Sequence, residues 1–306
     1  MAHSHSHDPH QHAPQRFDRA FALGIGLNLT YVLIEAFYGW QVNSLALLAD
    51  AGHNLGDVGG LVLAWAAIAA ARLRSNDRHT YGWRRASILA SFANALLLLV
   101  AMGSLGWESL QRLQQPEPIA GVTVMLVAGI GVLVNAITAW LFVSGSRHDL
   151  NLRGAFLHMA ADALVSIGVV LAGALYLWQG WLWLDPVVSL IIAAVIVIGT
   201  WSLFRQSLHL LFDGVPEQID LAAVRQYLQD LPGVKDVHDL HVWAMSTNEV
   251  ALTAHILIEP LPTDDRWLHE VTQELREHFV IAHCTLQLEA ERGCQLSCAT
   301  PPTPPK

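Results

Sequence analysis

Residues 47–61 read LLADAGHNLGDVGGL and lie inside a weakly charged, apolar stretch that runs from residue 44 to residue 71. A helix of about 20 residues crosses the ~30 Å of hydrocarbon in a bilayer, so this stretch is long enough to span a membrane. Five further stretches of the same kind occupy residues 20–40, 86–110, 119–145, 154–178 and 184–204. The sequence therefore predicts a polytopic α-helical membrane protein with six transmembrane helices, within residues 17–210.

The composition and the basic residues agree with a membrane domain and suggest its orientation. Of the 306 residues, 53% are hydrophobic and only 14% are charged, which is too apolar for a soluble protein of two domains. Lys and Arg close to spans tend to stay in the cytoplasm, and of the eleven such residues up to Arg205 only Arg112 lies opposite the N-terminal tail. We expect both termini to be cytoplasmic, and the first span to be retained because no signal-peptide pattern precedes it.

The part after residue 210 has the pattern of a soluble domain. Residues 220–230 and 264–280 are predicted helices, and 237–244, 250–259 and 283–290 are predicted strands. The sequence thus predicts an α+β, ferredoxin-like (αββαβ) cytoplasmic domain over residues 211–292, between a His-rich tail at 1–16 and a Cys/Pro-rich tail at 293–306.

The net charge of −9 is placed unevenly along the chain. Residues up to 210 carry 11 basic and 11 acidic side chains, whereas residues 211–306 carry 6 and 15. An acidic soluble domain argues against nucleic acid as a partner and is compatible with a surface that collects cations. The three cysteines all lie in this cytoplasmic part, where thiols are kept reduced, so we expect no structural disulfide.

Two of the predicted spans carry the same polar pattern, His-x-x-x-Asp. His53 and Asp57 lie in the second span, and His158 and Asp162 lie in the fifth, within FLHMAADALVSIG. Residues four apart share one face of a helix, so two such helices would offer two imidazoles and two carboxylates. This is the number and type of ligands of a tetrahedral Zn²⁺ site, and ionisable residues at membrane depth are functional candidates by default.

The alternative for a single pair is an ordinary buried hydrogen bond in a helix bundle. The two pairs, however, recur 105 residues apart, which is the difference between positions 53 and 158. Each falls in the second helix of a three-helix half, as a 3+3 repeat with its site between the halves would place it. We therefore favour a metal site. Asp50, one turn before His53, is either an acceptor for that imidazole, a lining residue of the entry path, or a residue near the start of the helix.

The chain resembles the cation diffusion facilitator family over residues 17–292. The resemblance rests on the following segments in combination: LLADAGHNLGD, RHTYGWRRASILA, HMAADALVS, WLDPVVSLIIA, LLFDGVP, VHDLHVW and TAHI. It implies a homodimeric metal/proton antiporter of the zinc-preferring type, with cadmium also accepted, whose transport site is His53, Asp57, His158 and Asp162. It further implies an ion pair between Arg85 and Asp213 that holds the dimer's helices together, in a network where this chain has Ser87 in place of the usual Glu.

Further metal ligands are expected in the cytoplasmic domain, on adjacent strands. The candidates, which the family pattern places at similar positions, are His238, His241, His255 and Glu289. His238 and His241 are three residues apart, so regular pleating puts them on opposite faces and at most one should join His255 unless the strand bulges. The alternative is surface histidines on a solvated strand.

Both tails contain residue types, His and Cys, that commonly bind metals. The tract MAHSHSHDPHQH suits loose metal binding, although a purification tag is the other explanation. The resemblance to related proteins suggests that Cys294 and Cys298, at C-x-x-x-C spacing, cooperate with this tract, and the alternative is that they are reduced bystander thiols.

These patterns indicate efflux of a divalent metal ion, zinc first, across a membrane, which we expect to be a bacterial inner membrane. A metalloenzyme would need an open coordination position and a positioned base, and four protein ligands would close the site. A sensor without transport would need no metal site at membrane depth.

Overall fold

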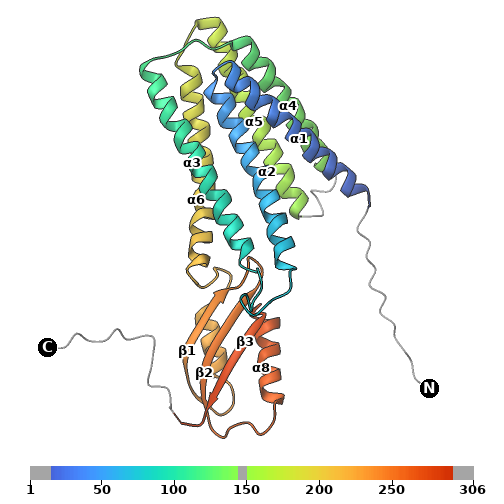
Figure 1. The fold of residues 1–306 in the computed structure, drawn as a ribbon, viewed down its shortest axis with the longest axis vertical. Coiled ribbons are helices and arrows are strands. Elements are labelled where there is room, and N and C mark those ends of the chain that lie inside the picture. Colours follow the sequence, from blue (N-terminus) through green and yellow to red (C-terminus); the bar gives the residue numbers. More distant parts are fainter. Residues whose placement is uncertain (1–14, 144–149, 292–306) are drawn as a thin grey trace, which may run out of the picture. The chain divides into compact units, whose positions relative to one another are not determined.

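The computed structural model describes residues 15–143 and 150–291, with side chains from residue 26 onward except at 68, 141, 142 and 150–155. Six long helices come first (Figure 1): α1 (Gln15–Gln41), α2 (Leu45–Ala71), α3 (Ala86–Gln114), α4 (Gly121–Val143), α5 (Leu150–Gln179) and α6 (Leu184–Leu211). They coincide with the six predicted apolar stretches. Among the described residues, five helices, α2 to α6, are long and apolar enough to cross a membrane. A sixth span at α1 stays a prediction.

The contacts within the chain divide it into two compact units, each of which is described separately. One contains the residues up to 58 together with 98–198, and the other contains 59–97 together with the residues from 199 onward. The division passes through α2, α3 and α6, so it separates networks of contacts rather than segments of the chain.

The first unit has a core of apolar side chains from several helices. α4 packs along α5 and against α1. The buried cluster includes Leu47 of α2, Met102 of α3, Ala128 of α4, Val169 of α5 and Ile192 of α6. Many large apolar side chains of the same helices remain exposed, Leu33, Trp140 and Ile198 among them. Such an outer surface is unfavourable in water and ordinary in lipid, which agrees with membrane-spanning helices.

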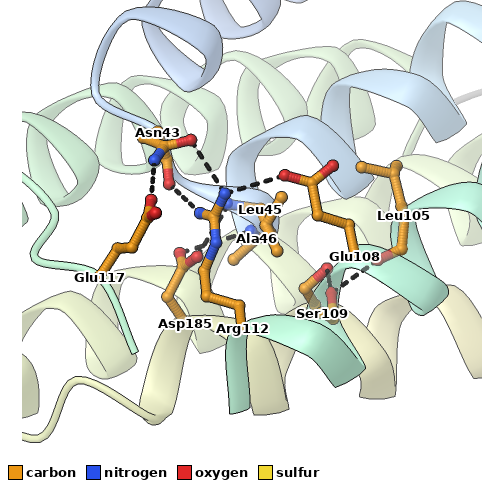
Figure 2. Close-up of polar contacts among 10 residues, drawn as sticks. Asn43, Leu45, Ala46, Leu105, Glu108, Ser109, Arg112, Glu117 and Asp185 are labelled. Atoms are coloured by element: carbon orange, nitrogen blue, oxygen red, sulfur yellow. Dashed lines mark hydrogen bonds and ion pairs between the residues drawn. The ribbon is translucent and has the colours of Figure 1, made fainter. Parts of the chain in front are cut away.

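The start of α2 is held by residues from two other helices (Figure 2). The carboxylate of Asp185, in the first turn of α6, accepts hydrogen bonds from the Leu45 backbone N–H (2.8 Å), the Ala46 backbone N–H and the Ser44 hydroxyl. A helix leaves its first N–H groups without partners, so Asp185 caps α2 from outside the helix.

Arg112, in the last turn of α3, binds the turn that precedes α2. Its guanidinium donates to the backbone and side-chain oxygens of Asn43 and to Glu108, and its side chain is only 7% exposed (Figure 2). Asn43 adopts a positive φ of 57° and also donates to Glu117. The turn between α1 and α2 is therefore fixed by the ends of α3 and α6.

The soluble part of the second unit contains α7 (Leu221–Gln229), β1 (Val234–Ala244), β2 (Val250–Ile258), α8 (Arg266–Glu277) and β3 (His283–Glu289). The predicted αββαβ order is confirmed. The described strands form one sheet in the order β1-β2-β3, with β1 and β2 antiparallel and β2 and β3 parallel. Leu228 of α7 and Leu275 of α8 join the buried side chains of the sheet in one core. A complete ferredoxin-like sheet has four strands, whereas the described sheet has three. The ferredoxin-like assignment therefore remains a prediction.

Candidate functional site

The four residues of the two His-x-x-x-Asp pairs lie together in the first unit. The Nε2 atom of His158 lies 3.0 Å from Asp57 Oδ2 and 3.6 Å from Asp162 Oδ2. The Nε2 atom of His53 lies 3.7 Å from Asp57 Oδ2 and 3.7 Å from Asp162 Oδ1. Each imidazole therefore lies between both carboxylates. Ligand atoms of His53, His158 and Asp162 fall within 4.8 Å of one another, while Asp57 joins the group through the two histidines.

The donor atoms of this cluster have few partners of their own. His53 Nδ1, Asp57 Oδ2 and Asp162 Oδ2 are buried and make no hydrogen bond to a described residue, although Asp57 Oδ2 lies 3.0 Å from His158 Nε2. Unsatisfied buried polar atoms are rare, and each calls for an explanation such as an ion. Two imidazole nitrogens and two carboxylates match the chemistry of a zinc ligand set.

The exposed fraction of the ligand side chains changes along both helices. On α5 the side chain of His158 is 40% exposed, whereas that of Asp162, one turn later, is 3% exposed. On α2 the side chain of Asp57 is 37% exposed, whereas Asp50, two turns earlier, is fully buried. The more exposed ligands are therefore Asp57, nearer the end of α2, and His158, nearer the start of α5.

Asp50 makes no hydrogen bond to His53 in this structure. The Nδ1 atom of His53 has no hydrogen-bond partner among the described residues, and Asp50 instead accepts from the Ser166 hydroxyl (3.1 Å) and interacts with the carboxyl group of Glu35. Glu35 in turn accepts from the Tyr31 hydroxyl (2.6 Å). Sequence reasoning missed Tyr31 and Ser166. Helical spacing in the sequence could have indicated them, because Tyr31 precedes Glu35 by four residues and Ser166 follows Asp162 by four.

A second cluster lies on the sheet of the soluble domain, where His238, His255 and Glu289 come together from three strands. His238 of β1 is paired with His255 of β2, and their rings lie 5.4 Å apart at 68°. Glu289 Oε1 lies 2.9 Å from His255 Nδ1, and Glu289 Oε2 lies 3.4 Å from His238 Nε2. Within the part of the chain that the structure describes, both ring nitrogens of His238 and one oxygen of Glu289 have no hydrogen-bond partner, so this donor set also fits a divalent cation.

His241 does not belong to this cluster. The register of β1 against β2 shifts between His238 and His241, and Asp239 between them has a positive φ of 50°. After the shift His241 is opposite Thr253, and its side chain, half exposed, lies 3.1 Å from Asp239 Oδ1. Asp239 is a residue that sequence reasoning missed. Its other carboxylate oxygen lies 3.8 Å from His255 Nε2, on the side of the ring away from Glu289.

The predicted ion pair between Arg85 and Asp213 is present within the second unit. Two neighbouring contacts link the start of α3 to the turn between β1 and β2. Arg84 binds Glu249 at 2.8 Å, and the Thr247 backbone N–H donates to the Ser87 hydroxyl. Ser87 thus takes part in the polar network at this junction.

Of the three cysteines, the structure describes Cys284. Cys284 is a free thiol in β3, and its burial raises its pKa to about 11, so it is protonated at neutral pH and a poor metal ligand. The remaining tail candidates, namely the N-terminal histidines, Cys294 and Cys298, lie outside the described residues.

Comparison with known proteins finds similarity along nearly the whole chain. Residues 22–212 match the family model described as cation efflux transmembrane domain, and residues 216–291 match the one described as cation efflux protein, cytoplasmic domain. Zinc transporter ZitB of Escherichia coli is 36% identical over 292 residues, covering 94% of this chain and 93% of its own. The cadmium, cobalt and zinc/H(+)-K(+) antiporter of Bacillus subtilis is 35% identical, covering 85% of each chain. The metal cation efflux system protein CzcD of Cupriavidus metallidurans is 35% identical, covering 94% of this chain and 90% of its own.

Membrane-spanning helices with a His/Asp cluster, followed by a cytoplasmic domain with a His/Glu cluster, define an integral membrane protein of the cation efflux class. The chain belongs to the cation diffusion facilitator family, as both family models and the relatives show.

Proposed function

We propose that this protein exports divalent metal ions from the cytoplasm, zinc before others and cadmium as well, through His53, Asp57, His158 and Asp162. The observation that carries the proposal is the position of each imidazole between both carboxylates, with carboxylate oxygens that lack hydrogen-bond partners. The names of the relatives, a zinc transporter and a cadmium, cobalt and zinc antiporter, support the same substrates. The protein acts as a secondary active transporter and not as an enzyme.

Zinc leaves in exchange for external protons. Without a metal ion, two carboxylates that both approach the same imidazoles in a poorly solvated cluster cannot easily both stay ionised, so the cluster takes up protons that Zn²⁺ displaces. The more exposed ligands, Asp57 and His158, lie toward the ends of α2 and α5 that the basic residues assign to the cytoplasm. This supports a state that accepts metal from the side of both termini.

The architecture that goes with this function has six spans, with α1 as the first, and places the membrane domain at 17–210 and a ferredoxin-like cytoplasmic domain at 211–292. The protein is a homodimer in a bacterial inner membrane, in contact with lipid. The match of residues 216–291 to the cytoplasmic domain of cation efflux proteins and the bacterial relatives support this arrangement.

The cytoplasmic domain regulates transport by binding zinc at His238, His255 and Glu289. The excess of acidic residues, 15 against 6 basic after residue 210, makes two such domains repel each other. Each bound Zn²⁺ lowers the negative charge by two and so favours the association of the domains. The Arg85–Asp213 pair, at the junction with the membrane helices, holds the dimer's helices together.

The test is metal uptake by vesicles that contain the purified protein, with and without a pH gradient, for a panel of divalent ions. Export is expected to be fastest for zinc, to respond to the pH gradient and to dissipate it. Zinc flux that neither responds to nor dissipates the gradient would rule out proton exchange, and absence of flux for every ion would rule out transport.

A further inference from the structure

A pair of fully buried acids lies beside the metal cluster in the first unit. Glu35 of α1 and Asp50 of α2 are both 0% exposed, and their carboxyl groups interact electrostatically with each other. One oxygen of each already has a donor, because the Tyr31 hydroxyl donates to Glu35 Oε1 and the Ser166 hydroxyl donates to Asp50 Oδ2. The other two oxygens, Glu35 Oε2 and Asp50 Oδ1, accept no hydrogen bond from any described donor.

This arrangement is unfavourable if both acids are ionised. Two neighbouring negative charges at membrane depth need a cation or a proton. Arg112 is the one Lys or Arg side chain that the structure describes in this unit, and it already binds Asn43 and Glu108. A single shared proton would remove both the charge repulsion and the lack of a hydrogen bond. An O–H on one carboxyl group donates to the other and leaves one negative charge in place of two.

We propose that Glu35 and Asp50 form a proton-binding site, separate from the four metal ligands, which holds one shared proton and releases it when a divalent cation binds the neighbouring cluster. The inference rests on the proposed transport function. It adds a second source of protons for exchange.

The coupling is electrostatic. Both acids interact with Asp162, the most buried of the four candidate ligands. Among the described residues, the other titratable group that interacts with both acids is Tyr31 of α1. A divalent charge at Asp162 favours the ionised pair, so the carboxyl O–H bond breaks and the proton passes to water or buffer. The pair then carries two negative charges near the bound cation.

The test counts the protons released when zinc binds the purified full-length protein. Calorimetric titrations at one pH, in buffers of different ionisation enthalpy, give this number directly. Glu35→Gln replaces the shared proton by a permanent amide donor to Asp50, so it is expected to bind zinc and to release about one proton fewer per zinc at the membrane cluster. Glu108→Gln, a matched change at a half-exposed acid of the same unit, should release the wild-type number.

The outcomes separate this inference from the proposed function. If the wild-type protein releases protons and Glu35→Gln releases just as many, the proton-binding pair is wrong while exchange stands. If the wild-type protein releases none, the exchange mechanism itself fails.

Infrared spectroscopy on the wild-type protein covers the case in which Glu35→Gln does not fold. A protonated carboxyl band is expected before zinc is added and should disappear afterwards. Ser166→Ala removes a hydrogen bond from Asp50 and should shift this band. A wild-type spectrum without such a band, or a band unaffected by both zinc and Ser166→Ala, overturns the inference.

Discussion

Replacing Asp162 by asparagine tests the metal cluster most directly. The change keeps the size of the side chain and removes half of the negative charge that the four ligands supply. Asp162 approaches both imidazoles, with its oxygens 3.7 Å from His53 Nε2 and 3.6 Å from His158 Nε2. Residues that merely orient a metal ligand typically contribute about 10–100-fold to affinity. Loss of a charged ligand should exceed the upper end of this range, which corresponds to at least ~2.7 kcal/mol.

The expected loss is measured as zinc uptake into vesicles that contain an internal fluorescent zinc indicator. At the zinc concentration that half-saturates the wild-type protein, a 100-fold weaker site is about 1% occupied instead of half occupied, so flux should fall to roughly 2%. Glu108→Gln, which also neutralises an acid of this unit, should transport normally. Size-exclusion chromatography shows whether the variant is folded. If Asp162→Asn is folded and its half-saturating zinc concentration lies within about tenfold of wild type, Asp162 is not a ligand.

Four further outcomes are expected. His53→Asp should extend transport to harder ions such as Mn²⁺, because a carboxylate replaces an imidazole, and an unchanged metal profile in the same vesicles would contradict this. Asp185→Ala should lower the free energy of unfolding by about 2–3 kcal/mol, because it removes a charged cap and its hydrogen bonds. Denaturant titrations measure this change, and an unaltered midpoint of the unfolding transition would refute the capping role. His255→Ala combined with Glu289→Ala should raise the zinc concentration for half-maximal flux and weaken zinc-induced compaction seen by scattering, without abolishing transport. Alkylation of Cys284, followed by peptide mass spectrometry, should accelerate about tenfold per pH unit up to about pH 11, because burial raises its thiol pKa; a plateau near pH 9 would contradict that environment.

Much of the fold follows from local sequence. The length and apolarity of the stretches predict the helices, because the alternative in a membrane is unpaired backbone. The spacing of His53 and Asp57, and of His158 and Asp162, places each pair on one helix face before any tertiary contact is known. The soluble elements follow from alternation and turn residues.

What the sequence could not supply depends on tertiary contacts and on single backbone conformations. The choice between His238 and His241 depends on the positive φ of Asp239 and the shift of register beside it, which no strand pattern reveals. The cap of α2 comes from Asp185, about 140 residues away in the chain. The proximity of Glu35 and Asp50 likewise requires the packing of α1 on its neighbours.

The attachment of the turn before α2 makes the first residues of that helix a fixed point about which the helix can tilt. Asn43, Arg112 and Asp185 bind its first residues to α3 and α6 (Figure 2), so tilting that preserves these bonds must turn about that end. Asp57 lies 12 residues beyond Leu45, which is about 18 Å along a helix. A tilt of about 10° at the fixed end therefore moves Asp57 by about 3 Å, comparable to the separations within the His/Asp cluster. Small rotations about this pivot are enough to assemble or dismantle the ligand set.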